Sequence, residues 1–261
     1  MDPQQHLEAL ARDGRSFAAA CADFSAPVAA CPGWTTADLV WHLAEVHHFW
    51  RTVVAQRLGA PDGYEQPARP GDDDLLACYR SGLDETLAVL RAADPAQPNW
   101  TWSADPADHT AGFVIRRMAH ETAVHCWDAQ DAAGDLRPID AELASDGIDE
   151  FLSHFLGAGS GAEPGRSVGG SVHLHCGDVP GEWTVRPDAD GGFVVTREHA
   201  KGDAAIRGAA GDILLALWRR RPLNTLGPVG DTVDTVDTVD TVEVVGDAAV
   251  AERFVALTRL E

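Results

Sequence analysis

Residues 110–132 read TAGFVIRRMAHETAVHCWDAQDA, and this stretch decides the first part of the fold. Its side chains recur at spacings of four and three residues, the period of an α-helix, and Gly134 follows as a helix-ending residue. The resulting stripe contains Val114, Met118, Glu121, His125 and Asp128. The apolar members of this stripe predict that it faces the interior of a helical bundle, so we expect its polar members there as well.

Five helical segments are predicted within residues 1–157, and four of them are long. One carries a clear start signal, because Thr35 can cap a helix and Asp38, three residues later, completes a capping box. Four long helices joined by loops are typical of an antiparallel four-helix bundle. The segments are residues 3–24, 35–58, 72–93, 110–132 and 139–156.

Beyond residue 157 the pattern changes from helical to alternating. Residues 158–170 are rich in glycine and serine and are predicted to form a linker. Within residues 171–176 the apolar positions alternate with His173 and His175, which we therefore expect on the solvent face of a strand. Further strands and helices predict a small α+β domain over residues 171–261. They are strands near 183–185, 193–196 and 204–207, and helices near 213–218 and 247–258.

Residues 231–242 are four tandem copies of Asp-Thr-Val. A period of three residues fits neither a strand nor a helix, so the repeat is predicted to be an expanded surface loop. An acidic Ca²⁺ loop is the alternative. It has little support, because the acids stand three residues apart and the glycine pattern of an EF-hand is missing.

Charge and cysteine content exclude several classes of protein. The chain has 261 residues, with 41 acidic and 20 basic side chains and a net charge of −21. This charge disfavours nucleic acids and anionic membranes as partners. The five cysteines are far apart, no apolar stretch could span a bilayer, and the first residues do not resemble a signal peptide. We therefore expect a reduced, cytoplasmic protein.

A second helical stripe places another imidazole in the bundle interior. His42 lies among the apolar positions of the segment 35–58. Glu121 and His125 are separated by four residues and share one face of their helix. A buried carboxylate needs a partner, and a divalent metal ion supplies one. Two histidines, one glutamate and an open position describe a catalytic zinc site, in which Asp128 would accept a hydrogen bond from His125.

Other readings of the same residues remain open. Each histidine could be an ordinary hydrogen-bonded core residue, and Glu121 could pair with Arg116 or Arg117. The sequence holds no convincing serine or cysteine nucleophile and no nucleotide-binding motif. The Arg219–Arg221 run is the sharpest positive feature of the chain. It can bind a substrate carboxylate or answer the dipole of the preceding helix.

With these residues in view, the chain resembles the mycothiol-dependent maleylpyruvate isomerase family over essentially its whole length. The resemblance implies an N-terminal DinB-like four-helix bundle and a small α+β C-terminal domain. The family's zinc triad falls on His42, Glu121 and His125, and its functional arginine is best matched by Arg221, with Arg220 second. The motifs are CPGWT at 31–35, HLA at 42–44, ExxxHxxD at 121–128, GxxxDILLxLWxRR at 208–221 and VGD at 245–247.

The resemblance implies an enzyme that needs Zn²⁺ and the thiol cofactor mycothiol. A metal-activated thiol would add to a small, carboxylate-bearing electrophile, as in an isomerase or an S-transferase. A DinB-like metal hydrolase and a non-catalytic small-molecule-binding member are the alternatives. A monomer or a homodimer is expected, without nucleic acid or membrane partners.

Overall fold

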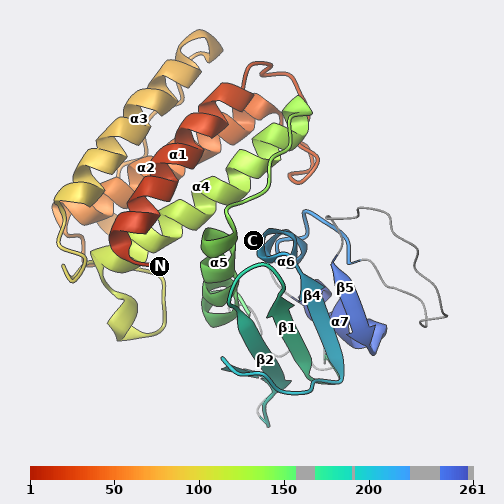
Figure 1. Ribbon diagram of the computed structural model, residues 1–261. Coiled ribbons are helices and arrows are strands. Elements are labelled where there is room, and N and C mark those ends of the chain that lie inside the picture. The colour runs from red at the N-terminus through yellow and green to blue at the C-terminus, as the bar shows by residue number, and fades with distance from the viewer. Residues whose placement is uncertain (157–167, 190–191, 224–241, 258–261) are drawn as a thin grey trace. The chain divides into compact units, whose positions relative to one another are not determined.

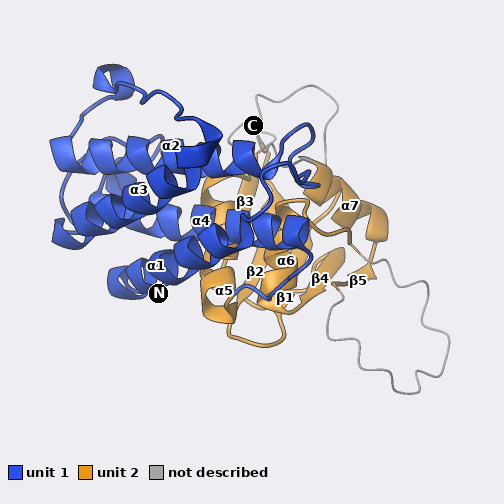
Figure 2. Cartoon of the chain, turned by 90° about the horizontal axis from the view of Figure 1, so that it is seen from above, with its two compact units in different colours: residues 1–139 blue, residues 140–261 orange. Residues whose placement is uncertain are grey.

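The computed structural model divides into two compact units, Met1–Ile139 and Asp140–Glu261 (Figure 1, Figure 2). The colours of Figure 2 follow this division. The structure describes residues 1–156, 168–189, 192–223 and 242–257.

The first unit is a four-helix bundle, as the sequence predicts. Helix α1 packs against α3 and α4, and helix α2 packs against the same two helices. Two 3-10 turns, η1 and η2, lie in the connections on either side of α3. The bounds are α1 Pro3–Ala20, α2 Thr36–Gln56, η1 Pro61–Gly63, α3 Asp72–Ala92, η2 Pro106–Asp108 and α4 Ala111–Ala133.

Local signals set the ends of the two helices that matter most for the site. Thr35 caps α2, and Asp38 bonds back to the Thr35 backbone, so the predicted capping box is present. The Thr110 side chain caps α4. Gly134 ends α4 in the left-handed conformation with a φ of 70°, which glycine adopts without strain.

The apolar stripes of α2 and α4 form the core of the bundle. Val114 and Met118 are fully buried, as are Leu39 and Leu43 of α2. Burial of each such side chain contributes roughly 1.5–3 kcal/mol and fixes how the helices face one another. His42 is only half-buried, because it lies where the α2 stripe meets a cavity.

The described residues of the second unit form three helices and a mixed five-stranded sheet of order β3-β2-β1-β4-β5. Strands β1 and β4 are parallel, and the other neighbours are antiparallel. The α+β prediction is confirmed, although β5 was not expected as a strand. The bounds are α5 Ala141–His154, β1 Val172–Cys176, β2 Glu182–Pro187, β3 Phe193–Thr196, β4 Ala204–Gly208, α6 Ala210–Leu217, β5 Glu243–Gly246 and α7 Ala248–Leu257.

The expected domain boundary needs correction. The sequence placed the helix at 139–156 in a bundle of residues 1–157, whereas α5 packs against α6 and belongs to the second unit. Its amphipathic period predicts a buried face but does not say which partner covers that face. Residues 158–167 of the expected linker and 231–241 of the Asp-Thr-Val repeat lie outside the described residues.

The expected exposure of His173 is also wrong. The residue is only 7% exposed, and Thr184, its partner across the strand pair, is fully buried. The His199 ring packs against His173, with the ring centroids 5.0 Å apart, so an alternating pattern does not mean that one face is in water. His175, two residues on, is half-buried.

Among the described residues, none of the helices is long and apolar enough to cross a membrane.

Candidate metal centre

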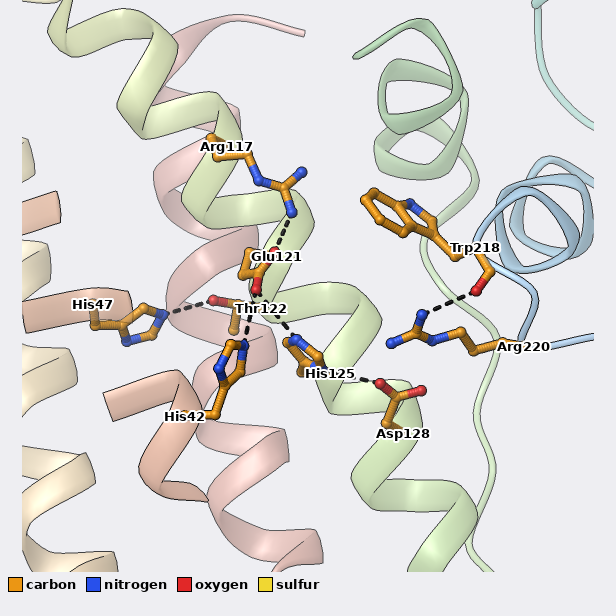
Figure 3. A network of polar contacts seen from close by, with 9 residues as sticks. All are labelled: His42, His47, Arg117, Glu121, Thr122, His125, Asp128, Trp218 and Arg220. Carbon is orange, nitrogen blue, oxygen red and sulfur yellow. Dashed lines mark hydrogen bonds and ion pairs between the residues drawn. The ribbon is translucent and has the colours of Figure 1, made fainter. Parts of the chain in front are cut away.

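The packing of α2 against α4 brings the three predicted ligands together (Figure 3). One oxygen of Glu121, Oε1, lies 3.4 Å from His42 Nε2 and 3.2 Å from His125 Nε2. The two imidazole rings are 5.0 Å apart and nearly perpendicular. Both histidines therefore direct a ring nitrogen at the same carboxylate oxygen, although they come from different helices.

The donor set fits a divalent metal ion. One ligand atom from each of these residues lies within 4.8 Å of the other two. Zinc–ligand bonds of about 2.0–2.1 Å place tetrahedral donors roughly 3.3 Å apart. The Glu121 distances to His42 and His125 are close to that spacing. Three ligands would leave a fourth position open, as in catalytic zinc sites.

Arg117 holds the other oxygen of Glu121. The Arg117 guanidinium donates to Glu121 Oε2 from one turn earlier on α4, and the arginine side chain is only 7% exposed. The arginine pairing that the sequence left open is therefore present. It occupies one carboxylate oxygen and leaves the other facing the histidines, so both interpretations of Glu121 are compatible.

The surroundings keep Glu121 anionic. Burial alone would raise its pKa, but the charge of Arg117 and hydrogen bonds from His125 and His42 outweigh burial and hold the pKa well below its usual range. A carboxylate that is ionised at neutral pH is the form that coordinates a cation.

Asp128 orients His125, as predicted. Its carboxylate, with a fully buried side chain, accepts a hydrogen bond of 2.9 Å from His125 Nδ1. Burial lowers the pKa of His125, but the bonds to Asp128 and Glu121 prevail and raise it to about 9. At neutral pH both ring nitrogens therefore carry a proton, and a metal ion would replace the one at Nε2 while Asp128 keeps the one at Nδ1, the usual arrangement of a metal-binding histidine.

His47 is a polar core residue that the sequence did not single out. It stands five positions after His42, points to another sector of α2 and is fully buried. Its Nε2 contacts the hydroxyl of Thr122 at 2.8 Å (Figure 3). Burial lowers its pKa to about 3, so His47 is neutral. In the sequence, only its spacing of five residues from His42 shows that His47 lies on a different face of the helix from His42.

A cavity of about 250 Å³ opens beside the candidate centre, and His42 forms part of its wall. The Trp34 ring packs on His42 from the loop before α2, at a centroid distance of 5.0 Å. Aromatic and polar side chains together suit a small organic ligand. The lining residues are His42, Glu45, Val46, Phe49, Trp50, Tyr64 and Gln66.

Cys31 also reaches the centre. It offers a sulfur within 4.8 Å of donor atoms of His125 and Asp128. The sequence showed this cysteine only as part of the CPGWT motif. Its place beside His125 depends on the loop between α1 and α2, which no helical period could predict.

The arginine run lies in the second unit, directly after α6. Arg219 donates to the carbonyls of Val255 and Ala256 near the end of α7. Arg220 donates to the Trp218 carbonyl at 2.9 Å (Figure 3). Arg221 forms a 2.8 Å ion pair with Asp212. The catalytic role expected for Arg221 or Arg220 stays a prediction.

Comparisons with known proteins agree with this architecture. The mycothiol maleylpyruvate isomerase N-terminal domain model matches residues 7–130, and the MDMPI C-terminal domain model matches residues 142–253. A comparison with curated proteins gives no match.

Two crystal structures share the fold: the mycothiol-dependent maleylpyruvate isomerase and a histidine-to-alanine mutant of it. Their identities to this chain are 12% and 10%, and the TM-scores are 0.50 and 0.51. Each alignment covers 83% of this chain and 88% of the other. From the two domain matches, which together span most of its length, the chain belongs to the mycothiol maleylpyruvate isomerase family.

Proposed function

We propose that this chain is a metal- and mycothiol-dependent enzyme of the maleylpyruvate isomerase type. A small thiol would add to an electrophilic, carboxylate-bearing substrate, and the outcome would be isomerisation or S-transfer. The observation that carries the proposal is the convergence of His42 and His125 on one oxygen of Glu121. Family membership supplies the thiol, since the related enzyme is described as mycothiol-dependent.

When bound to His42, Glu121 and His125, a Zn²⁺ ion would supply an open coordination position and lower the pKa of a thiol, which is ordinarily about 8.5. The chain's own residues prepare this position. Arg117 fixes the rotamer of Glu121, and Asp128 holds the proton of His125 at Nδ1. The cavity beside His42 offers room for part of a substrate.

The substrate chemistry follows from the reactivity of a thiolate. A thiolate that adds to an electron-poor double bond leaves a single bond, about which the substrate can rotate. Departure of the thiol then gives the isomer, whereas retention of the adduct gives an S-conjugate. With a net charge of −21, the chain needs a local cation to attract an anionic substrate. We assign that role to Arg221, with Arg220 as second candidate.

Metal analysis and a thiol-dependent assay test the proposal. Tag-free protein is loaded with Zn²⁺, and turnover of maleylpyruvate is measured with and without mycothiol. We expect about one ion per chain in the bundle and turnover only with thiol, both lost in Glu121→Ala. The matched control is Glu85→Ala, which removes a glutamate that pairs with Arg51 at 2.7 Å on the bundle surface.

Two outcomes would contradict the proposal. Hydrolysis of added esters or amides without thiol would favour the hydrolase alternative. Metal-free protein that binds a small molecule as tightly after Glu121→Ala as before would favour a non-catalytic binding role.

A further inference from the structure

The sheet of the second unit carries its own cluster of imidazoles and a carboxylate. Strands β1 and β2 are antiparallel neighbours (Figure 1). Their register sets His175 opposite Glu182 and His173 opposite Thr184. His173 and His175 stand two residues apart and point to the same face of β1. The strand register therefore sets two histidines and one glutamate side by side, far along the sequence from the centre in the bundle.

Hydrogen bonds tie the cluster together. Glu182 Oε1 lies 2.5 Å from His175 Nδ1 and 3.2 Å from His199 Nδ1. The His173 ring lies 5.0 Å from the His199 ring and 6.0 Å from that of His175. Donor atoms of His173, His175 and Glu182 all lie within 4.8 Å of one another. Donor atoms of three side chains thus lie together, and His199 lies beside two of them, Glu182 and His173.

His173 contributes a buried atom without a hydrogen bond. Its Nε2 is inaccessible to water and has no partner among the described residues. A buried polar atom of this kind destabilises the fold unless something binds it.

From this geometry we propose a second transition-metal site, formed by His173, His175 and Glu182, with His199 available as a fourth ligand. Imidazoles with one carboxylate suit Zn²⁺ and its first-row neighbours rather than Mg²⁺ or Ca²⁺. Four protein donors would close the coordination sphere, which is typical of structural rather than catalytic zinc sites. The ion would bind the nitrogen of His173 that has no hydrogen bond, and it would link β1 and β2 to the segment around His199. This site is independent of the proposed function, which concerns the bundle.

Zinc binding by tag-free, full-length Glu121→Ala protein tests the inference, because this background removes the central ligand of the bundle. Binding of Zn²⁺ alone is measured by equilibrium dialysis and elemental analysis, and Co²⁺ absorption reports the coordination geometry. We expect about one ion per chain, with a tetrahedral Co²⁺ spectrum. Adding His175→Gln or Glu182→Gln should weaken binding roughly tenfold or more.

These substitutions avoid the buried His173 and keep a hydrogen-bonding group, so the fold should survive, which thermal unfolding checks. The matched control is His109→Gln in the same background, since His109 lies outside the cluster and contacts the Ser103 carbonyl. Binding that is unchanged by His175→Gln and Glu182→Gln would overturn the proposal, as would an absence of zinc binding in the Glu121→Ala protein.

The two proposals fail differently. If the bundle site is absent, wild type and Glu121→Ala bind the same single ion, and His175→Gln removes it. If the sheet site is absent, Glu121→Ala abolishes binding by itself.

Discussion

The bundle and the sheet each gather two histidines around one glutamate, but they protect the carboxylate in opposite ways. Glu121 has a side chain that is 17% exposed and forms an ion pair with the buried Arg117. Glu182 is 29% exposed and contacts two histidines, His175 and His199. The buried carboxylate depends on a fixed cation, whereas the half-exposed one shares its charge with water.

The largest expected effect comes from removing the cation that pairs with Glu121 in the bundle. Arg117→Met would leave Glu121 buried without its cation and should lower the free energy of unfolding of the metal-free protein by about 3–5 kcal/mol. Glu182→Gln in the sheet should cost less than about 1 kcal/mol, because its partners are half-exposed or exposed. Urea denaturation of the two variants measures both values. Equal losses would show that burial does not separate the two sites.

Removing the orienting carboxylate should weaken metal binding at the bundle alone. Asp128→Asn keeps the shape but weakens the charge-assisted bond to His125. We expect Zn²⁺ affinity at the bundle to fall roughly 10–100-fold, measured by competition with a chelator. Asp131→Asn, on the same helix, serves as the control and should leave the affinity unchanged. A similar fall in both variants would point to a general loss of negative charge.

The buried His47 should make the stability of the bundle depend on pH. Its pKa is about 3 in the folded state against an ordinary 6.5, so below pH 6.5 the unfolded chain binds a proton that the folded chain does not. The stability of the protein should therefore fall as the pH drops from about 6.5 toward 3, by about 2 kcal/mol at pH 5 from this residue alone.

His47→Gln should remove the part of the stability loss at acid pH that comes from this residue. Urea denaturation at pH 7 and pH 5 gives the difference between the variant and the wild type at each pH. If the difference in unfolding free energy between variant and wild type is the same at pH 7 and at pH 5, the assignment of a lowered pKa to His47 is contradicted.

The smallest effect concerns the start of the helix that carries His42. Thr35→Ala removes the side-chain cap of α2 and should cost about 1 kcal/mol of unfolding free energy. Thr110→Ala, the equivalent change on α4, should cost a similar amount. Thermal unfolding measures both. A loss well above 2 kcal/mol for either residue would mean that the threonine does more than cap its helix.

Several features of the bundle could be predicted because they are local. The capping box at Thr35, the end of α4 at Gly134 and the inward stripe of α4 follow from spacing within one segment. The meeting of Glu121 and His125 is local too, since one helical turn separates them. The approach of His42 could be inferred because two inward stripes of one bundle must share a core.

Other features depend on distant neighbours and escaped prediction. Helix α5 shows an apolar face, but only packing decided that α6 covers it. His173 occupies a polar position of an alternating strand, yet it is buried, with the His199 ring 5.0 Å from its own. The spacing of His173 and His175 carries no sign of Glu182, which the strand register places opposite.

The sequence alone determined the helices and most strands, the bundle as the first fold, and a His–Glu–His centre within it, because periodicity and capping act over a few residues. Tertiary structure decided where α5 belongs, that Arg117 takes the second oxygen of Glu121, and that a second histidine cluster forms on β1 and β2. These outcomes depend on which surfaces meet, and the free energy of such contacts is shared between segments far apart in the chain, so no single segment encodes it.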